Sequence, residues 1–462
     1  MKIILSHAYF LEEDPKELQI MKPYPPLGLL YVSAYLEQSG IDHEVYDSTF
    51  SNKVKWMQIV AAQQPDVIAL YTNLMTKVRL IEMIAELRSL DGLSKTKIVL
   101  GGPDVTYNLE DYLQHGADFL VVGEGEETFK ELIDQLKGEE RFEDVDGLAF
   151  TNKKGQKTIN QARVKIKKVD ELPLPNRKRI DLTHYLKAWR DNHGKSTLNI
   201  STQRGCPYTC KWCSTAVYGK SYRRRSPQLV VDEIEHLIQE YDVDALWFVD
   251  DVFTVSHKWL KAFSEEMQSR NIRIPFECIT RAERMNEEVI LQLKSAGCFR
   301  IWIGAESGSQ RIIDLMDRQV NIGAVSEMMN LTNKHGIETG TFIMVGYPTE
   351  TVEDIDLTIN YLKEANPDLF TITVAYPIKG TGLYEQIKSK ITVQHDWAKS
   401  TDRQIEFERT YSRRFYDFAV RRIVNEVNYH KQKIEGKSWS KRAMIFKLKS
   451  EVSHFQMKRL LG

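Results

Sequence analysis

Short apolar segments alternate with amphipathic segments of helical length along most of this 462-residue chain. Gaps of helix length between strands favour parallel pairing. In the first 150 residues the strands are expected at Lys2–Ser6, Glu44–Tyr46, Val67–Tyr71, Ile98–Leu100 and Phe119–Val122, and the helices at Leu27–Gln38, Val54–Ala62, Lys77–Leu90 and Glu126–Leu136. The pattern therefore predicts a doubly wound, Rossmann-like α/β domain over residues 1–145.

Glycine and polar residues follow three of these predicted strands. Ligands of open parallel sheets sit at the carboxyl ends of strands, and glycines there let a large planar ligand approach the backbone. We expect a binding site at these turns, although ordinary strand-ending turns would use the same residue types. The residues are Thr72, Asn73, Leu74, Gly101, Gly102, Gly123, Glu124 and Gly125.

From Leu198 the alternation resumes, after an expected linker over residues 146–195 with a predicted hairpin turn at Asn152–Gly155. Six strand–helix units predict a partial (β/α)6 barrel over residues 196–390, and barrel chemistry gathers at the carboxyl ends of strands. The strands are expected at Leu198–Thr202, Ala245–Val249, Pro275–Ile279, Arg300–Gly304, Gly340–Val345 and Leu369–Ala375, and they are followed by Cys206, Asp250 and Asp251, Arg281, Glu306, Gly346 and Pro377.

Three of the five cysteines, Cys206, Cys210 and Cys213, fall within eight residues. Iron–sulfur clusters are held by cysteine thiolates and normally use four, so three on one loop leave one iron open to a substrate or cofactor. A zinc site would need a further ligand, and the nearest histidines, His193 and His236, follow no finger spacing. A disulfide would leave one cysteine over. The loop therefore predicts a reactive iron–sulfur cluster.

This loop resembles the signature C-x-x-x-C-x-aromatic-C of the radical S-adenosylmethionine (SAM) superfamily. The resemblance implies a [4Fe–4S] cluster on the three cysteines, whose fourth iron chelates SAM, and an external electron donor such as flavodoxin or ferredoxin. It also implies that SAM is cleaved to a 5′-deoxyadenosyl radical. The implied SAM contacts are Trp212, Asp250, Asp251, Arg281, Glu306 and Gly346. For Asp251, a helix cap before Ser256 is the alternative.

A doubly wound domain ahead of such a barrel is similar to the cobalamin (B12)-binding-domain radical SAM family. The segments Pro25–Gly28, Leu100–Pro103, Val122–Glu126 and Arg409–Tyr416 carry this likeness. The resemblance implies that the turns after the third, fourth and fifth strands bind cobalamin. Many cobalamin domains carry Asp-x-His-x-x-Gly, whose His ligates cobalt, but Asp47–Asn52 here has neither the His nor the Gly. Cobalamin without a lower His ligand is therefore implied, or a domain that has lost cobalamin.

The family resemblance implies methylation of an unactivated carbon in a small-molecule, lipid or natural-product substrate. Oxidative cyclases and ring-rearranging enzymes of the same family are the alternative. A tRNA methylthiotransferase would carry a second set of cysteines near its N-terminus, but residues 1–150 contain none. A sensor without enzymatic activity would not require an intact Cys206, Asp250 and Glu306. No nucleic-acid partner is expected.

The net charge of the chain is only −1, but positive and negative residues are unevenly distributed along it. From Arg403 to the end the chain has 15 Lys and Arg against 6 Asp and Glu, so the remainder is acidic. Residues 391–462 are predicted to form a basic helical region. Its last stretch interleaves basic and apolar residues, a pattern that suits either an anionic membrane surface or a helix capping the acidic remainder.

No apolar stretch approaches the roughly 18 residues of a membrane-spanning helix. The segment Met1–Leu5 is typical of a strand and not of a signal peptide. Cys278 and Cys298 stand alone in the sequence and are expected to be buried hydrophobic residues. Together these features predict a cytoplasmic location.

Overall fold

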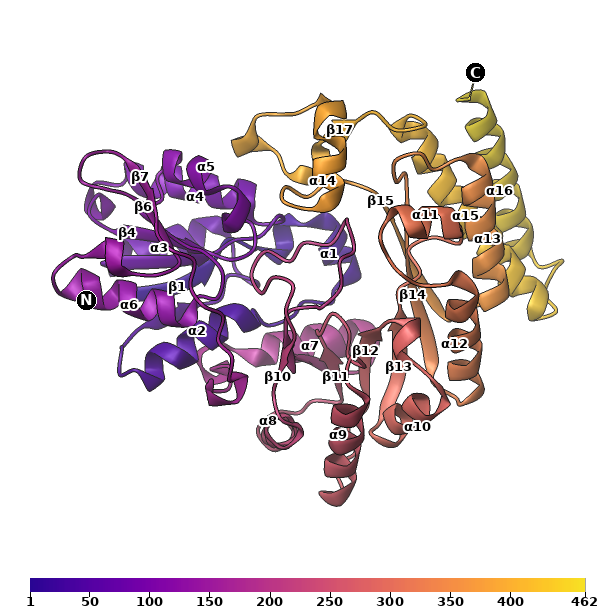
Figure 1. Cartoon of the computed structure of the whole chain (residues 1–462), viewed down its shortest axis with the longest axis horizontal. Coiled ribbons are helices and arrows are strands. Elements are labelled where there is room, and N and C mark those ends of the chain that lie inside the picture. The colour runs from indigo at the N-terminus through magenta and orange to yellow at the C-terminus, as the bar shows by residue number, and fades with distance from the viewer. Residues whose placement is uncertain (462) are drawn as a thin grey trace. The chain divides into compact units, whose positions relative to one another are not determined.

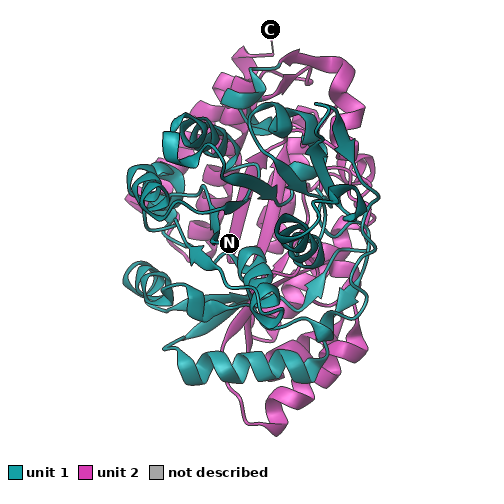
Figure 2. Ribbon diagram, turned by 90° about the vertical axis from the view of Figure 1, so that its left-hand side faces the viewer, with its two compact units in different colours: residues 1–207, 214–247, 394–404 teal, residues 208–213, 248–393, 405–462 magenta. Residues whose placement is uncertain are grey.

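The structure is a computed structural model that describes residues 1–461, in two compact units (Figures 1 and 2). The first unit comprises residues 1–207, 214–247 and 394–404, and the second comprises residues 208–213, 248–393 and 405–462. The four domain ranges expected from the sequence remain predictions, because each compact unit takes in segments from more than one of them.

A seven-stranded sheet forms the centre of the first unit, in the order β2-β1-β3-β4-β5-β6-β7. Strands β1 to β5 are parallel, while β6 and β7 form an antiparallel hairpin at one edge, joined through the turn predicted at Asn152–Gly155. The strands are β1 Ile3–His7, β2 Glu44–Tyr46, β3 Val67–Tyr71, β4 Lys97–Gly101, β5 Phe119–Val121, β6 Leu148–Thr151 and β7 Lys157–Ile159. The predicted doubly wound sheet is confirmed.

Helices cover both faces of this sheet, with a separate hydrophobic core on each side. Side chains of α3 (Lys53–Gln63), α4 (Lys77–Ser89) and α5 (Leu109–Gln114) fill one core. Side chains of α2 (Leu27–Gln38) and α6 (Glu126–Lys137) fill the other. Two further helices that were not predicted, α1 (Pro15–Ile20) and α7 (Leu182–His193), also belong to this unit. Burial on two faces explains why the strands are almost continuously apolar.

A second sheet has the strand order β15-β14-β13-β12-β11-β8, and the pairs from β12 to β15 are parallel. Its strands are β8 Thr197–Ile200, β11 Ala245–Phe248, β12 Phe276–Thr280, β13 Cys298–Ile303, β14 Glu338–Val345 and β15 Leu369–Val374. Between them lie α8 Pro227–Glu240, α9 His257–Ser269, α10 Glu287–Ser295, α11 Gln310–Leu315, α12 Ile322–Lys334 and α13 Val352–Ala365. Strands and helices thus alternate, with two helices, α11 and α12, between β13 and β14, and this alternation confirms the predicted partial barrel.

The C-terminal region begins differently from its purely helical prediction. After α14 (Gly382–Ile387), the short strands β16 (Ile391–Val393) and β17 (Glu406–Phe407) pair antiparallel. Two long helices then follow, α15 (Arg413–Ile434) and α16 (Lys441–Arg459), and α15 packs against both α13 and α16 (Figure 1). Within residues 1–461 no helix is long and apolar enough to span a membrane.

Candidate functional site

The cysteine segment of the second unit is held at both sides by backbone hydrogen bonds. The Lys211 amide donates to the Met316 carbonyl at 3.0 Å, and the Leu383 amide donates to the Lys211 carbonyl at 2.7 Å. The Thr209 hydroxyl adds a 2.6 Å hydrogen bond to Asp317 Oδ2. These contacts fix the loop between the end of α11 and the start of α14, so that Cys210 and Cys213 project from a restrained backbone.

Arg281, which follows β12, links this loop to the carboxyl ends of the barrel strands. Its Nη1 donates to the Cys210 sulfur at 3.3 Å, and its guanidinium lies 3.8 Å from the centre of the Tyr208 ring. The side chain is buried and also contacts the Glu283 carboxylate and the Arg318 carbonyl. Arg281 therefore places a buried guanidinium directly beside the sulfur of Cys210.

Cys206 lies in the first unit, directly after Gly205. Gly205 has a φ of +83°, and a Cβ there would lie 2.6 Å from the Ser221 carbonyl oxygen, so only glycine fits. In the part of the chain that the structure describes, no three His, Cys, Asp or Glu side chains are grouped to hold a metal ion. The chemistry of the donor set, three cysteines outside any disulfide with Arg281 on one of them, nevertheless fits an iron–sulfur cluster. Their assignment as ligands stays a prediction.

Trp212 packs against an apolar cluster at the carboxyl ends of the fifth and sixth barrel strands, and this cluster includes Tyr347 and Ala375. Tyr347 follows Gly346, whose φ is +77° and whose amide donates to Glu350 at 2.5 Å. Burial raises the pKa of Glu350 to about 8, although the Gly346 amide opposes this rise. Trp212 and Gly346, both implied SAM contacts, therefore belong to one packed region of the second unit.

Glu306 continues the fourth strand in an unusual backbone conformation. Its φ is +67°, a region that non-glycine residues rarely adopt, and its amide and carbonyl still pair with Phe342 and Met344 of β14. Burial raises the pKa of its carboxyl to about 7, while the charges of Arg318 and Arg281 act in the opposite direction. The structure thus brings the predicted residues Glu306 and Arg281 within electrostatic reach of each other.

Asp250 and Asp251 follow β11 and differ in exposure. Asp250 is buried, whereas the Asp251 side chain reaches the surface. Partial desolvation by the surrounding protein raises the pKa of Asp251, and the neighbouring charge of Asp250 adds to this rise. The alternative role of Asp251 as a helix cap is wrong, because Ser256 caps α9 through the amide of Trp259.

In the first unit, the turns after β3 and β4 touch each other closely. The Thr72 amide donates to the Gly101 carbonyl at 2.7 Å. Gly102 has a φ of +115°, and a Cβ at this position would lie 2.2 Å from the Thr72 carbonyl oxygen. The side chain of Asn73 accepts from the amides of Met75 and Thr76, and its backbone amide donates to the Thr76 hydroxyl, so the turn is held by its own hydrogen bonds. Glycine at position 102 is therefore required by close backbone approach.

The turn after β5 carries a buried ion-pair network that the sequence did not reveal. Arg204, two residues before Cys206, donates Nη1 to Glu124 at 2.8 Å and Nη2 to Glu126. Arg223 donates to the second oxygen of Glu124 at 2.7 Å. Burial alone would lower the pKa of Arg204, but the Glu126 and Glu124 carboxylates raise it. The Glu124 carboxylate is thus already paired, and this network ties the predicted cobalamin turn to the start of the cysteine loop.

The strand order of the first sheet identifies a further site element at the end of β1. Ligands bind where the strand order reverses, which for the order 2-1-3-4-5 lies between β1 and β3. At this position the His7 Nε2 and the Asp47 carboxylate lie 2.9 Å apart, and Asp47 also accepts from the Tyr185 hydroxyl at 2.6 Å. Burial by itself would raise the pKa of Asp47, but the contacts with His7 and Tyr185 outweigh this effect and lower the pKa to about 2. The two ring nitrogens of His7 are both occupied, since Nδ1 lies 2.8 Å from the Ser48 hydroxyl.

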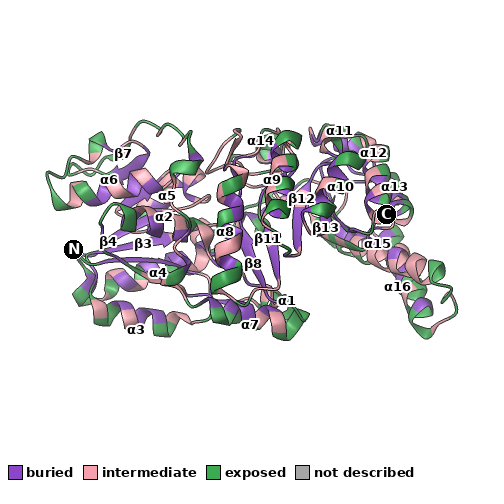
Figure 3. Ribbon diagram, turned by 90° about the horizontal axis from the view of Figure 1, so that it is seen from below, coloured by how far each residue is buried: buried purple, intermediate pink, exposed green. Residues whose placement is uncertain are grey.

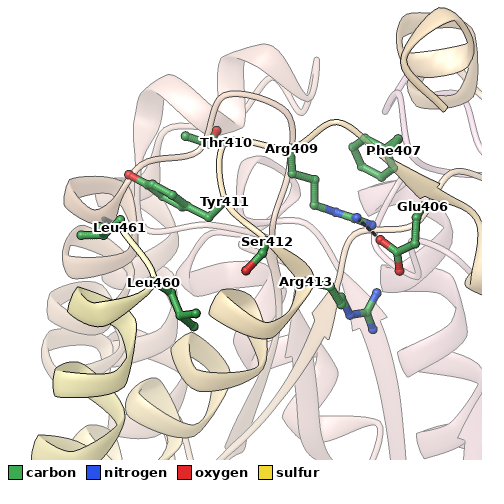
Figure 4. Close-up of a pocket in the computed structure, with 9 residues that line it drawn as sticks. All are labelled: Glu406, Phe407, Arg409, Thr410, Tyr411, Ser412, Arg413, Leu460 and Leu461. Carbon is green, nitrogen blue, oxygen red and sulfur yellow. Dashed lines mark hydrogen bonds and ion pairs between the residues drawn. The ribbon is translucent and has the colours of Figure 1, made fainter. Parts of the chain in front are cut away.

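The first part of the C-terminal segment Arg409–Tyr416, from Arg409 to Arg413, lines a cavity of about 460 Å³ in the second unit (Figure 4). Arg409 is 2% exposed, donates to the Ala375 carbonyl at 3.0 Å and pairs with Glu406 at 2.6 Å. The Tyr416 ring packs against Gly346 at the end of β14. The tail segment that resembled the family therefore supports the ends of the fifth and sixth barrel strands.

Comparison with known proteins agrees with both parts of the chain. Residues 19–133 match the model of the B12 binding domain, and residues 200–362 match that of the Radical SAM superfamily. A protein named uncharacterized methyltransferase PH0819, from Pyrococcus horikoshii, is 31% identical over 389 residues, which cover 82% of each chain. The anaerobic magnesium-protoporphyrin IX monomethyl ester cyclase of Rubrivivax gelatinosus is 25% identical over 81% of this chain and 68% of its own.

The fold has a close counterpart among solved structures. The cobalamin-dependent SAM radical enzyme OxsB with aqua-cobalamin bound superimposes with a TM-score of 0.75, at 16% identity, over all of this chain and 77% of that chain. The extent of the match to the Pyrococcus horikoshii protein, together with the two matched regions, settles the family. The chain belongs to the cobalamin (B12)-binding-domain radical SAM enzyme family.

Proposed function

We propose that this protein is a cobalamin-dependent radical SAM methyltransferase that methylates an unactivated carbon of a small-molecule, lipid or natural-product substrate. The observation that carries the proposal is the 31% identity to a protein named as a methyltransferase, over 82% of both chains and across both matched regions. An external one-electron donor such as flavodoxin or ferredoxin would supply the reductant.

In this proposal Cys206, Cys210 and Cys213 hold a [4Fe–4S] cluster, which when bound supplies an electron for the reductive cleavage of SAM. Arg281 contacts the Cys210 sulfur at 3.3 Å and would direct positive charge toward the carboxylate of SAM. Trp212 and Gly346 form the apolar and backbone surfaces against the adenine.

Glu306 and Asp250 would receive the positively charged amino group of SAM. The pKa of Glu306 is raised to about 7 by burial, so this carboxyl is only partly ionised near neutral pH when the site holds no cation. An ammonium group nearby favours the ionised carboxylate. Binding of SAM should therefore release a proton from Glu306 at pH 7, and the resulting pair fixes the amino group.

The turns containing Thr72, Asn73, Leu74, Gly101, Gly102, Gly123, Glu124 and Gly125 would hold cobalamin, which when bound supplies the methyl group for transfer. The glycine backbone at these turns provides a surface without side chains, and the paired carboxylate of Glu124 holds the third turn in place. His7 has both ring nitrogens engaged by Asp47 and Ser48. We propose that the lower face of cobalamin has no histidine ligand in this protein.

A second candidate is oxidative ring formation or rearrangement. The Rubrivivax gelatinosus relative, at 25% identity, is named as a cyclase and favours this alternative. The two functions differ in the fate of SAM, because methyl transfer forms S-adenosylhomocysteine and radical initiation forms 5′-deoxyadenosine.

The test is to reconstitute the full chain anaerobically and quantify both SAM products, with and without cobalamin. The proposal predicts both products, with S-adenosylhomocysteine dependent on cobalamin and with 5′-deoxyadenosine abolished by Cys210→Ala. Formation of 5′-deoxyadenosine alone, unchanged by cobalamin, would contradict methyl transfer. The matched control is Cys298→Ala, which removes a buried cysteine outside the loop and should leave both products unchanged.

A further inference from the structure

Helix α16 exposes most of its large apolar side chains to solvent and buries mainly small residues. The residues that it buries are small or isolated, namely Ala443, Ser450, Ser453 and Met457, and the helix packs on α15. Ser450 on this inner face donates to Glu426 of α15 at 2.8 Å. The large apolar residues of the helix lie on its outer surface, where Figure 3 shows exposed residues along its length.

The exposed apolar residues form one continuous stripe. Ile445, Leu448, Val452 and Phe455 follow one another at steps of three or four residues, and Met444 lies four residues before Leu448, so all five lie on a single helix face. Leu448 is 61% exposed, Val452 50% and Phe455 58%. Single exposed apolar residues are ordinary, but a contiguous stripe on one face marks an interaction surface.

Positive side chains border this stripe on both sides. With about 100° between successive residues of a helix, Lys447 and Lys458 lie along one edge, and Arg442 and Lys449 lie along the other. Lys441 and Arg459 stand at its two ends. The only acidic residue of α16 is Glu451. Trp439, which precedes the helix, is 88% exposed.

The charge pattern decides between the partners that an apolar stripe could meet. A second copy of this helix would bring the same cations face to face, and their repulsion would oppose association. An anionic bilayer instead attracts each Lys or Arg at its surface by about 1 kcal/mol. An apolar face bordered by Lys and Arg, with an aromatic residue at one end, is the pattern of helices that lie in the membrane interface.

We propose that α16 docks this protein on anionic phospholipid membranes, with Ile445, Leu448, Val452 and Phe455 inserted at the boundary between headgroups and acyl chains. Lys441, Arg442, Lys447, Lys449, Lys458 and Arg459 contact the lipid phosphates, while Ala443, Ser450 and Ser453 keep the opposite face on α15. The docking does not depend on the cofactors, so it stands apart from the proposed function.

The test is flotation of the full chain with vesicles of phosphatidylcholine alone or with roughly one third phosphatidylglycerol, at low and high salt. The wild-type protein should float with the anionic vesicles, and salt should weaken this binding. The double variant Leu448→Gln with Phe455→Gln keeps every charge, and its partition coefficient should fall at least about tenfold because two apolar insertions are lost.

The matched control replaces two exposed leucines elsewhere in the same unit, Leu291→Gln with Leu357→Gln, at 48% and 49% exposure. This variant should bind vesicles as the wild-type protein does. Circular dichroism should show unchanged folding for both variants, since all four side chains are exposed. Wild-type binding retained by the Leu448 and Phe455 variant would overturn the proposal, as would a wild-type protein that ignores the vesicles but loses self-association in that variant.

Discussion

At the scale of single residues, Glu306 in the barrel has a carboxyl whose pKa is strongly shifted. Burial raises the pKa of its carboxyl from 4.5 to about 7, against the opposing charges of Arg318 and Arg281. The folded protein therefore holds this proton more tightly than the unfolded chain. Its contribution to stability is favourable at low pH and is lost as the pH rises from about 4.5 to about 7.

Replacing Glu306 by Gln should remove this pH dependence. Between pH 5 and pH 8, the unfolding free energy of the apoprotein should fall relative to that of the Glu306→Gln variant by on the order of 2 kcal/mol. Anaerobic urea unfolding at both pH values measures the difference. The control is Glu353→Gln, since Glu353 is exposed and its pKa is lowered rather than raised. A difference between wild type and Glu306→Gln that does not change with pH would contradict the account.

Gly102 occupies a position where both the backbone conformation and the available space require glycine. A Cβ at this position would lie 2.2 Å from the Thr72 carbonyl oxygen, and the φ of +115° disfavours any other residue. Gly102→Ala should therefore lower the urea midpoint by the equivalent of about 3 kcal/mol or more. Gly40→Ala has a similar positive φ but no atom within 4 Å of the new Cβ, so it should cost only about 1 kcal/mol. Equal losses for the two variants would show that the turns after β3 and β4 do not touch.

Single residues differ in how far the sequence could predict them. Glu306, Arg281 and Gly346 were predictable because each follows a barrel strand, and that position depends only on local periodicity. The pairing of His7 with Asp47 was not predictable, because it joins residues 40 apart in the sequence at the ends of two strands. The left-handed backbone conformation of Glu306 could also not be predicted, since no residue next to it in the sequence requires a positive φ.

At the scale of elements, the turn after β5 and the segment before Cys206 are joined by Arg204. Its guanidinium bridges Glu124 and Glu126, and all three side chains are buried. Breaking a buried ion pair leaves an uncompensated charge, which costs more than the pair itself contributes. Arg204 is therefore a positioning residue that holds the β5 turn against the cysteine loop.

Arg204→Met should destabilise the protein by about 3–5 kcal/mol, because the buried Glu126 carboxylate loses its cation and Glu124 is left with Arg223 alone. Chemical denaturation of the apoprotein measures this loss. Arg141→Met removes an exposed ion pair with Glu139 and should cost at most about 0.5 kcal/mol. If the Arg204 variant proved as stable as the Arg141 variant, the network would have no structural role.

The elements themselves were largely predictable, and the failures have physical reasons. The predicted strands of both sheets lie within two residues of those observed, since apolar runs bounded by turns identify buried parallel strands. Helix α7 was missed because it falls within a stretch that was interpreted as a linker. The two expectations for α16, a cap over the acidic remainder and a membrane-binding helix, both stay predictions; the helix packs on α15 through Ala443, Ser450, Ser453 and Met457.

At the scale of the whole molecule, the chain passes repeatedly between the two compact units. Residues 394–404 belong to the first unit although they follow the last barrel strand. Trp397 in this segment donates to Asn108 at 3.1 Å and stacks edge-on against Tyr112. Sequence periodicity could not predict such a return, because it depends on contacts between residues almost 300 positions apart.

The central claim is that one chain carries both an iron–sulfur cluster and cobalamin. The most direct test is anaerobic reconstitution of the full chain with iron, sulfide and hydroxocobalamin, followed by desalting and metal analysis. The reconstituted wild-type protein should contain about four irons and about one cobalt per chain, and Cys210→Ala should lose the iron but keep the cobalt. Four irons without cobalt would contradict the cobalamin half of the account, and iron retained in Cys210→Ala would contradict the cluster assignment.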